Sequence, residues 1–407
     1  MLLRIMIVVL LPLVLRAEQL RIVHFNIKEL DSVKLGQGTK NSQVAAAVSV
    51  LRKLNPDFLS INEMQFDLPG IPSASFQSHG ENSMGMMNLL SLGWPQISIG
   101  FGPSNTGTLA KKIPNTDNYT TNSLRRELAD PVNFGVFPAE YSVAGATRFP
   151  VGARLFVQDL KWRDFRPDRD LSKFKDAAGN ALDPNKIELF DKNFMDMVVK
   201  IEGRDVHFIL LHTVPVHDFG KDGSPNSVRN ADQLSFLEWY LTGKTDFVPP
   251  DSLPVKPLEP GALFVAMGDW NVDVRDKNLP GALVLQRLFD KTNLWMDPSQ
   301  LDFTYESQSF YVPPYQDQLD YIITSKSTGL VIKKGGVYAP FARENRGCSL
   351  PEEPKSQGPE FVIVAYTDKQ SKEKCFAEVS SEYAEIKTAS DHRPVWLDLE
   401  VLPKNKE

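Results

Sequence analysis

The chain has 407 residues, of which 42% are hydrophobic and 24% are charged, so it can bury a large core and is neither disordered nor fibrous. Its formal net charge of −6 excludes a protein that coats nucleic acid by bulk electrostatic attraction. A nucleic-acid substrate is still compatible with this charge, because an enzyme needs only a local positive patch or a bound metal.

The first 17 residues are typical of a secretory signal peptide. Arg4 precedes an apolar run from Ile5 to Leu15, and Arg16, Ala17 and polar residues follow. The run is too short for a comfortable membrane span, and the small residue Ala17 suits a cleavage site. We therefore expect a signal peptide at 1–17 and a secreted or periplasmic protein. An uncleaved anchor and a buried first strand are the alternatives.

The first third of the chain indicates an α/β fold. Leu20–Ile27 alternates like a strand and places Asn26 near its exit. Ser42–Leu54 has apolar residues at helical spacing, and Asp57–Asn62 is a short strand that delivers Glu63. A strand, a helix and a strand in this order favour an α/β class over a sandwich of hairpins.

Periodicity weakens between 66 and 138, where Gly, Pro, Asn and Ser are frequent. This composition predicts a long surface insertion, of the kind that often forms one wall of a substrate cleft. The elements expected after it are structure at Tyr141–Phe156, strands at Phe194–Ile201 and Val206–Leu211, and a helix at Val228–Leu241. The second of these strands runs directly into His212.

The stretch Leu263–Val274, which reads LFVAMGDWNVDV, predicts a buried strand that ends at Gly268. Asp269 and Asn271 follow two positions apart, so in an extended chain their side chains point to the same side. A carboxylate beside a carboxamide suits a site that handles phosphate, water and a divalent metal. An ordinary turn after a strand is the alternative, since Gly, Asp and Asn are common turn residues.

The last third contains a short helix at Leu283–Phe289, a strand at Leu319–Ile323, a second irregular insertion near 335–375 and a closing strand at Val395–Val401. Both cysteines, Cys348 and Cys375, fall near or within this insertion, 27 positions apart. In an exported protein they could close one disulfide, and two reduced thiols are the alternative. A metal site built from these two alone is disfavoured.

Polar residues stand at five strand ends: Asn26, Glu63, His212, the pair Asp269 and Asn271, and the pair Asp391 and His392. Each has an ordinary structural explanation, because strands commonly stop at polar residues. Active sites of α/β folds, however, collect at strand ends. Their joint occurrence therefore predicts one site.

Six short motifs follow one another between residues 20 and 400: Phe25-Asn26, Pro56-Asp57 through Asn62-Glu63, Leu211-His212, Gly268-Asp269-Trp270-Asn271, Leu319-Asp320-Tyr321 and Ser390-Asp391-His392-Arg393-Pro394-Val395. In this order they resemble the endonuclease/exonuclease/phosphatase superfamily, which includes pancreatic-type deoxyribonucleases and neutral sphingomyelinases. The resemblance implies a single domain at 18–407, a four-layer α/β sandwich of two packed mixed β-sheets flanked by helices. The segments near 66–138 and 335–375 would then be insertions.

The resemblance also implies a metal-dependent phosphoric ester hydrolase. Glu63 looks like the principal ligand of a catalytic Mg²⁺, with Asn26 and Asp391 nearby as direct or water-mediated ligands. Hard oxygen ligands of this kind suit Mg²⁺ or Mn²⁺ better than Zn²⁺.

By the same resemblance, Asp269 activates or orients the attacking water, and Asn271 holds a phosphate oxygen or the nucleophile. His392, paired with Asp320, would face the phosphoryl group and neutralise charge there. His212 would be an acid to the leaving oxygen or a further phosphate donor.

Three further residues, Arg148, Arg229 and Gln233, resemble family segments less closely. Packing at a strand edge or on a helix explains them about as well as function does. We therefore leave them out of the predicted catalytic set.

The motifs around His212 and Asp269 look closest to the deoxyribonuclease-like branch. Abasic-site endonucleases usually lack this histidine, and inositol phosphatases carry Cys-Asp-Arg where this chain has Leu319-Asp320-Tyr321. We therefore expect a phosphodiesterase whose substrates include nucleic acid. A secreted phospholipid phosphodiesterase and a phosphomonoesterase are alternatives. A non-catalytic binding protein is disfavoured because no core position of the pattern is missing.

Overall fold

The computed structural model describes residues 17–77, 93–94, 96–217, 223–297, 300–306, 316–340, 343–368 and 371–404. Twelve of its strands form two large sheets. The first sheet contains β1 (Glu18–Leu30), β2 (Phe58–Met64), β3 (Ser98–Phe101), β4 (Ser142–Thr147), β13 (Leu330–Val337) and β17 (Val395–Val401). The second contains β5 (Val151–Val157), β6 (Phe194–Ile201), β7 (Arg204–Leu211), β8 (Leu263–Asp269), β9 (Thr292–Asn293) and β12 (Asp320–Ser325).

Both large sheets are mixed. The strand order is β13-β17-β1-β2-β4-β3 in the first sheet and β5-β6-β7-β8-β12-β9 in the second. The pairs β1–β2 and β7–β8 are parallel, and the other neighbours are antiparallel. The parallel pairs bring the carboxyl ends of β1 and β2, and of β7 and β8, to common edges.

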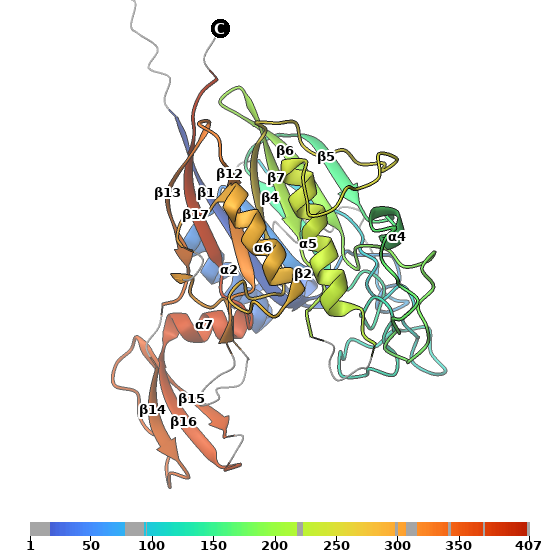
Figure 1. The fold of residues 1–407 in the computed structure, drawn as a ribbon. Coiled ribbons are helices and arrows are strands. Elements are labelled where there is room, and N and C mark those ends of the chain that lie inside the picture. Colours follow the sequence, from blue (N-terminus) through green and yellow to red (C-terminus); the bar gives the residue numbers. More distant parts are fainter. Residues whose placement is uncertain are drawn as a thin grey trace, which may run out of the picture.

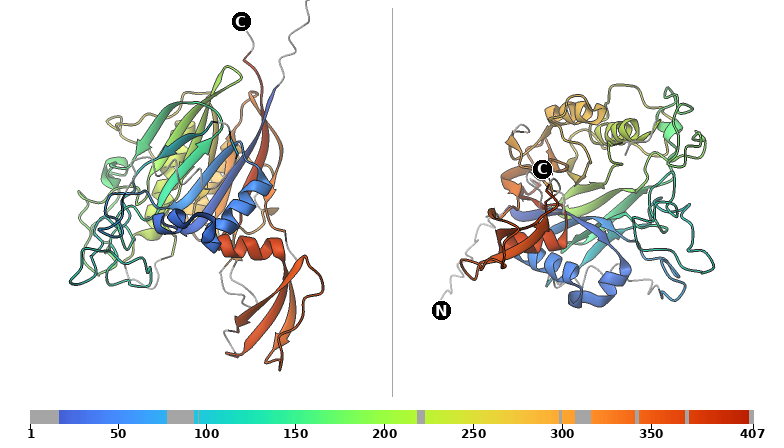
Figure 2. Two further views of the ribbon diagram at one scale, coloured as in Figure 1. Left: turned by 180° about the vertical axis from the view of Figure 1, so that it is seen from behind. Right: turned by 90° about the horizontal axis from the view of Figure 1, so that it is seen from below.

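The helices are α1 (Ser32–Gln37), α2 (Ser42–Leu54), α4 (Trp162–Phe165), α5 (Asn226–Thr242), α6 (Pro280–Lys291) and α7 (Ser381–Ala389), with a 3₁₀ turn η1 (Gly38–Lys40). Helices α2 and α7 lie outside the first sheet, while α5 and α6 cover the outer face of the second (Figures 1 and 2). A third apolar cluster fills the space between the sheets, where Phe58 stacks on Phe208 with ring centroids 4.0 Å apart. The predicted four-layer α/β sandwich is confirmed.

Local sequence explains why the predicted helix at Ser42–Leu54 forms with those bounds. The side chain of Asn41 accepts hydrogen bonds from the N–H groups of Gln43 and Val44, which the first turn of a helix leaves unpaired. At the other end Asn55 takes the left-handed conformation that commonly ends a helix. The buried face, which includes Val44, Ala47 and Leu51, packs on the first sheet.

The prediction of an irregular segment near 335–375 is wrong. β13 continues to Val337, and β14 (Arg343–Cys348), β16 (Lys374–Ser380) and β15 (Phe361–Thr367) form an antiparallel sheet that projects from the body (Figure 1). Cys348 and Cys375 lie opposite each other in it and form a disulfide. These strands could not be predicted from the sequence because they lack period-two alternation. Pairing with neighbouring strands stabilises them.

Two predictions fall partly outside the described residues. The expected signal peptide at 1–17 lies there except for Ala17, and so do 78–92 and 95 of the expected insertion at 66–138. The described part of that insertion contains turns and strand β3, which pairs with β4 at the edge of the first sheet. None of the helices within the described ranges is both long and apolar enough to cross a membrane.

Candidate active site

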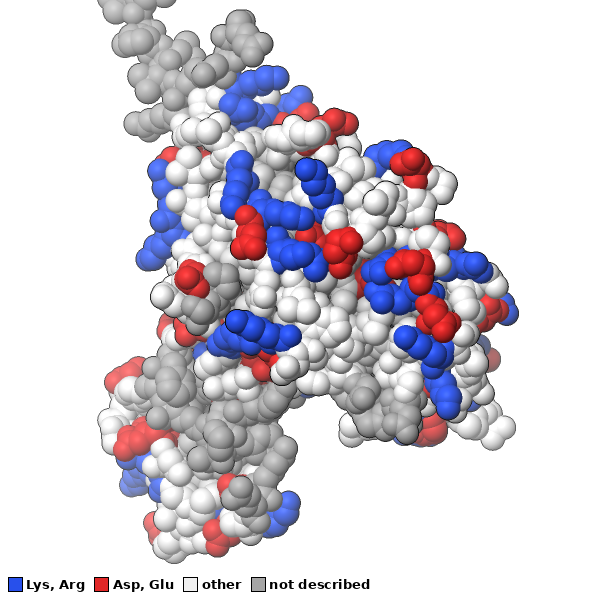
Figure 3. Space-filling view, in the orientation of Figure 1, with Lys and Arg blue, Asp and Glu red and all other residues white. Residues whose placement is uncertain are grey.

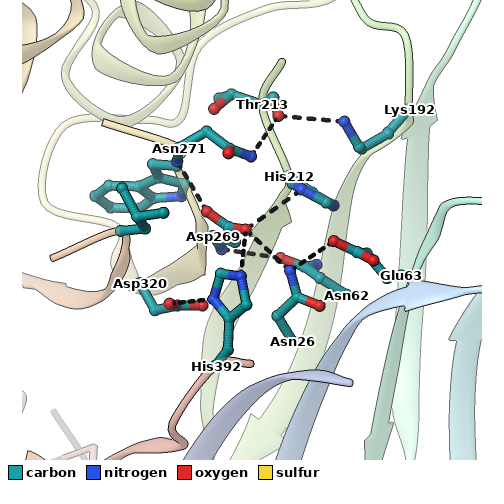
Figure 4. Close-up of polar contacts among 12 residues, drawn as sticks. Asn26, Asn62, Glu63, Lys192, His212, Thr213, Asp269, Asn271, Asp320 and His392 are labelled. Carbon is teal, nitrogen blue, oxygen red and sulfur yellow. Dashed lines mark hydrogen bonds and ion pairs between the residues drawn. The ribbon is translucent and has the colours of Figure 1, made fainter. Parts of the chain in front are cut away.

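Six strands bring polar side chains together where the two large sheets meet (Figure 4). The first sheet contributes Asn26 of β1, Asn62 and Glu63 of β2, and Asp391 and His392 just before β17. The second contributes His212 just after β7, Asp269 at the end of β8, Asn271 beyond it, and Asp320 at the start of β12. All eight residues predicted from the sequence are therefore near this junction. The antiparallel register of β8 and β12 places Asp269 opposite Asp320.

Asp269 is the residue on which the contacts converge. Its Oδ2 accepts a hydrogen bond of 2.9 Å from Nδ2 of Asn26. The same oxygen lies 3.5 Å from Nε2 of His212 and 3.6 Å from Nε2 of His392. Its Oδ1 accepts a hydrogen bond of 2.9 Å from the backbone N–H of Asn271. Two histidines from different sheets thus face one carboxylate oxygen.

Glu63 owes its position to an irregularity in β2. The sequence predicts that the strand stops before Glu63, but it continues to Met64, and the pairing of β2 with β4 shifts between Ile61 and Met64. Glu63 itself has a φ of 62°, which is uncommon for a residue other than glycine. A bulge of this kind re-aims a side chain, and such strained residues cluster at functional sites.

Hydrogen bonds fix the Glu63 carboxylate in the site. Oε1 accepts from Nδ2 of Asn26 at 3.0 Å, and Oε2 accepts from the backbone N–H of Glu29 at 3.1 Å. Its neighbour Asn62 accepts a hydrogen bond of 2.8 Å from the backbone N–H of Asp269. Residues of β2 therefore position both carboxylates of the site.

The buried histidine His392 and the buried carboxylate Asp320 shift each other's pKa. Burial by itself would lower the pKa of His392, but the carboxylates of Asp320 and Asp269 outweigh it and raise that pKa to about 10. Burial would likewise raise the pKa of Asp320, yet His392 and His24 hold it below the ordinary value. Nδ1 of His392 and Oδ2 of Asp320, 2.8 Å apart, therefore form an ion pair at neutral pH.

Asp269 and His212 are shifted in the direction that favours their uncharged forms. Burial raises the pKa of Asp269 to about 7, with His392 opposing the rise and Asp320 adding to it. Burial, followed by the charges of Lys192 and His392, lowers the pKa of His212 well below its ordinary value. His212 is thus a neutral imidazole at neutral pH, and its Nδ1 has no hydrogen-bond partner among the described residues.

Asn271 is held in place by the backbone of Thr213. Its φ is 52°, and its Nδ2 donates a hydrogen bond of 3.0 Å to the carbonyl of Thr213. The same carbonyl accepts from Nζ of buried Lys192 at 3.2 Å, and Lys192 pairs with Asp191 at 2.7 Å. The segment after β7 therefore positions Asn271 as well as His212.

Two groups of side chains could hold a metal ion. Ligand atoms of Glu63, His212 and Asp269 lie within 4.8 Å of one another, and so do those of Asp269, Asp320 and His392. Asp320 and His392 already satisfy each other, so the first group is the better metal site. Asn26 faces this group with Nδ2, which donates to Glu63 and Asp269, and its buried Oδ1 lacks a hydrogen-bond partner within the described part of the chain. Carboxylate and amide oxygens suit Mg²⁺ or Mn²⁺.

Asp391, the third predicted ligand, lies in neither metal-binding group. Its Oδ2 forms an ion pair of 2.9 Å with Nζ of Lys28. Its electrostatic influence still reaches Glu63, because burial and then the charge of Asp391 raise the pKa of Glu63. Asp391 is thus near the candidate metal site, with a cationic partner of its own.

The three residues left open between function and packing have structural partners. Arg148 pairs with Asp57 and Glu18. Buried Arg229 donates to the carbonyls of residues 188 and 189. Gln233 accepts from the N–H of Val214 and donates to Asp191, so it steadies the segment that carries His212.

Sequence reasoning gave no role to four residues that contact the site: His24, Lys28, Asn62 and Lys192. A signal existed for two of them. His24 precedes Asn26 by two positions on one strand and so shares its face, and Asn62 adjoins Glu63. Lys192 is a single lysine shortly before a strand, and no sequence pattern around it predicts a contact with the site.

No protein-family model matches the chain, and no curated protein matches it in sequence. Its structure is similar to an endonuclease/exonuclease/phosphatase from Beutenbergia cavernae (16% identity, TM-score 0.49, covering 94% of this chain and 72% of that one). It is also similar to a sphingomyelinase C from Streptomyces griseocarneus (11% identity, TM-score 0.46, 94% and 99%). A third similar structure is a mannosyl-6-phosphatase from Bacteroides thetaiotaomicron (12% identity, TM-score 0.43, 93% and 99%).

Proposed function

We propose that this protein is a metal-dependent hydrolase of phosphate esters. The observation that carries the proposal is the convergence of His212 and His392 on Oδ2 of Asp269, at 3.5 and 3.6 Å, beside the Glu63 carboxylate. A general base, a cationic hydrogen-bond donor and an acidic metal ligand are the groups that hydrolysis of a phosphate ester requires.

Of the group formed by Glu63, His212 and Asp269, Glu63 would hold Mg²⁺, or Mn²⁺ in its place, while the other two act on water and phosphate. Oδ1 of Asn26 would join Glu63 as a ligand if the amide, whose Nδ2 now donates to Glu63, turned over. Because Asp391 is paired with Lys28, it would contribute through a water molecule or after exchanging this partner. When bound, the metal would supply positive charge to the phosphate oxygens. Burial and the charge of Asp391 raise the pKa of Glu63, so its ionised carboxylate is disfavoured without a cation nearby. A bound metal ion would stabilise that ionised form.

Asp269 would accept the proton of the attacking water. Its pKa of about 7 lies near neutral pH, where a general base works best. Asn271 would orient this water: since its Nδ2 is engaged by the Thr213 carbonyl, the side chain offers its other atom, the acceptor Oδ1. Of the two roles predicted for Asn271, holding the nucleophile fits this arrangement better than holding a phosphate oxygen.

His392, kept positively charged by Asp320, would donate to a phosphate oxygen and stabilise the charge that grows in the transition state. His212 has a pKa well below its ordinary value because of burial and the nearby charge of Lys192. A neutral imidazole is a weak source of protons at neutral pH. We therefore assign His212 as a neutral donor to phosphate rather than as the acid for the leaving oxygen.

Within this reaction class we propose a phosphodiesterase with nucleic acid as a substrate. The motifs around His212 and Asp269 support this choice. Figure 3 shows Lys and Arg interspersed with Asp and Glu on the face formed by α5 and α6, where Arg287 and Lys291 pair with buried Glu238. That face does not suggest bulk attraction to nucleic acid, so binding would depend on the site itself.

A panel of four substrates tests the proposal. Mature protein is incubated with supercoiled plasmid, a bis-aryl phosphodiester, an aryl phosphomonoester or sphingomyelin vesicles, each with Mg²⁺, Mn²⁺ or a chelator. Cleavage of plasmid and bis-aryl phosphodiester, abolished by chelator, is the expected result. Preference for sphingomyelin or for the phosphomonoester would replace the nuclease assignment. Inactivity on all four would contradict the hydrolase itself.

We also propose that the protein is exported, with its signal peptide cleaved after Ala17, and that it is secreted or periplasmic. Glu18, the residue after this position, is the first residue of β1 and pairs with Val401 of β17. Cleavage there would leave the first strand complete. N-terminal sequencing of protein recovered from the medium or periplasm tests this directly.

A further inference from the structure

A third buried histidine, His24, lies on the far side of Asp320 from His392. Nε2 of His24 is 3.0 Å from Oδ1 of Asp320, and Nδ1 of His392 is 2.8 Å from Oδ2. Each carboxylate oxygen therefore has its own imidazole. Only one of the two rings, that of His392, also faces Asp269.

The contact between His24 and Asp320 crosses from one large sheet to the other. His24 belongs to β1 and Asp320 to β12, and both side chains are fully buried. Ile22, two positions before His24 and on the same face of the strand, packs in the apolar cluster between the sheets. A polar link through such a layer is costly unless every polar atom is paired, and both ring nitrogens of His24 are paired here.

Ser60 fixes how the ring of His24 is used. Its Oγ lies 3.1 Å from Nδ1 of His24, and the two residues face each other in the parallel register of β1 and β2. An ionised carboxylate only accepts hydrogen bonds, so the proton toward Asp320 sits on Nε2 of His24. The Ser60 hydroxyl, which can donate or accept, pairs with Nδ1 and holds the ring in this orientation.

We propose that His24 is a positioning residue: it holds one oxygen of Asp320 so that the other stays aligned with Nδ1 of His392. His392 in turn presents Nε2 toward Asp269 and the reacting phosphate. The inference rests on the proposed function, because the task of His392 is assigned there. A partner of this kind, one step removed from the reacting atoms, typically contributes about 10–100-fold to activity.

Two amide substitutions that differ by one methylene group distinguish a hydrogen-bonding role of His24 from a role in packing alone. In His24→Gln the amide nitrogen can reach the place of Nε2 and still donate to Asp320. In His24→Asn it reaches only the place of Nδ1, near Ser60. The matched control is the pair His207→Gln and His207→Asn, because Nδ1 of His207 contacts Asp196 at 2.7 Å in a His–Asp pair that does not involve Asp320 or His392.

Two readouts are measured on all variants. The first is kcat and KM for the bis-aryl phosphodiester with Mg²⁺. We expect His24→Asn to lower kcat about tenfold or more with KM changed less than twofold, and His24→Gln to keep kcat within about threefold of the unmodified protein. Both His207 variants should keep kcat unchanged.

The second readout is the Nδ1 proton resonance of His392 in protein labelled with ¹⁵N-histidine, assigned by its loss in His392→Ala. We expect it to shift or broaden in His24→Asn and to remain in His24→Gln. This readout needs no turnover, so it judges the role of His24 even if the protein cleaves no phosphate ester and the proposed function fails. An unchanged resonance and kcat in folded His24→Asn, or an equal loss of kcat in the His207 variants, would overturn the inference.

Discussion

Gly268 lies against the backbone of Leu211, so closely that a Cβ added at Gly268 would stand 1.7 Å from the carbonyl oxygen of Leu211. Each of these residues directly precedes a residue of the site: Asp269 is the last residue of β8, and His212 lies just after β7. The missing side chain lets β7 and β8 approach at this point. The contact of 3.5 Å between His212 and Asp269 depends on that approach.

We expect Gly268→Ala to lower the free energy of unfolding by about 3 kcal/mol, because the added methyl group overlaps a backbone atom that cannot move alone. Turnover should fall as well, since the strands would separate between His212 and Asp269. Urea denaturation and the rate of phosphodiester hydrolysis measure the two effects. Gly152→Ala is the control: its Cβ would meet only the Val198 carbonyl oxygen, at an ordinary 3.7 Å. Equal stability of the two variants would show that the close approach is not required.

Asp269→Asn should reduce kcat by about 10²–10⁴-fold, the usual contribution of a general base, because an amide cannot take the proton of the attacking water. Thermal unfolding should show that the fold persists. Asp276→Asn, in the exposed segment between β8 and α6, is the control and should keep full activity. An Asp269→Asn variant with near-normal kcat would remove Asp269 from the role of base.

His392→Ala should lower kcat by about 10²–10³-fold, since the variant loses the charged donor that faces phosphate. The substitution also leaves the buried carboxylate of Asp320 without one of its two partners, so some loss of thermal stability is expected. His207→Ala removes a comparable imidazole from Asp196 and should cost stability without cost in kcat. If both variants lost activity equally, the effect of His392 would be structural.

Glu140 provides a test by pH. Burial raises its pKa from 4.5 to about 8, so the folded protein retains a proton that the unfolded chain releases near pH 4.5. Folding thus takes up a proton between these values, and stability falls as the pH rises from 4.5 to 8 by at most about 1.4 kcal/mol per unit.

In Glu140→Gln this dependence should disappear, because the amide oxygen can still accept from the N–H of Val136 and has no proton to lose. The measurement is the difference in unfolding free energy between the two proteins, with chelator present, from pH 4.5 to 8. The variant should gain relative to the unmodified protein as the pH rises. A constant difference would mean that Glu140 is ionised in the fold.

Local patterns were sufficient to predict elements whose signals lie within themselves. The helix at Ser42–Leu54 carries its own cap, and the strand at 263–267 carries its own apolar run and terminating Gly268. The positions of Asn26, His212 and Asp269 at strand ends likewise indicated that these residues would lie near one another, because the ends of paired strands lie at the same edge of a sheet.

Features that depend on distant partners were not predictable. His24 acquires its role only through Asp320, 296 positions later in the chain. The bulge that turns Glu63 depends on the pairing of β2 with β1 and β4. The sheet of β14, β16 and β15 depends on neighbouring strands rather than on alternation within each one. In all three cases the determining contact joins separate elements.

In the proposed function, Glu63 holds the divalent metal on which phosphodiester hydrolysis depends. The most direct measurement is the rate of bis-aryl phosphodiester hydrolysis against Mg²⁺ concentration, for the unmodified protein and Glu63→Gln side by side after chelator treatment. We expect no activity without metal, saturable recovery in the unmodified protein, and at least about tenfold more Mg²⁺ for half-maximal recovery in the variant. Activity that persists in chelator, or identical Mg²⁺ curves for the two proteins, would contradict it.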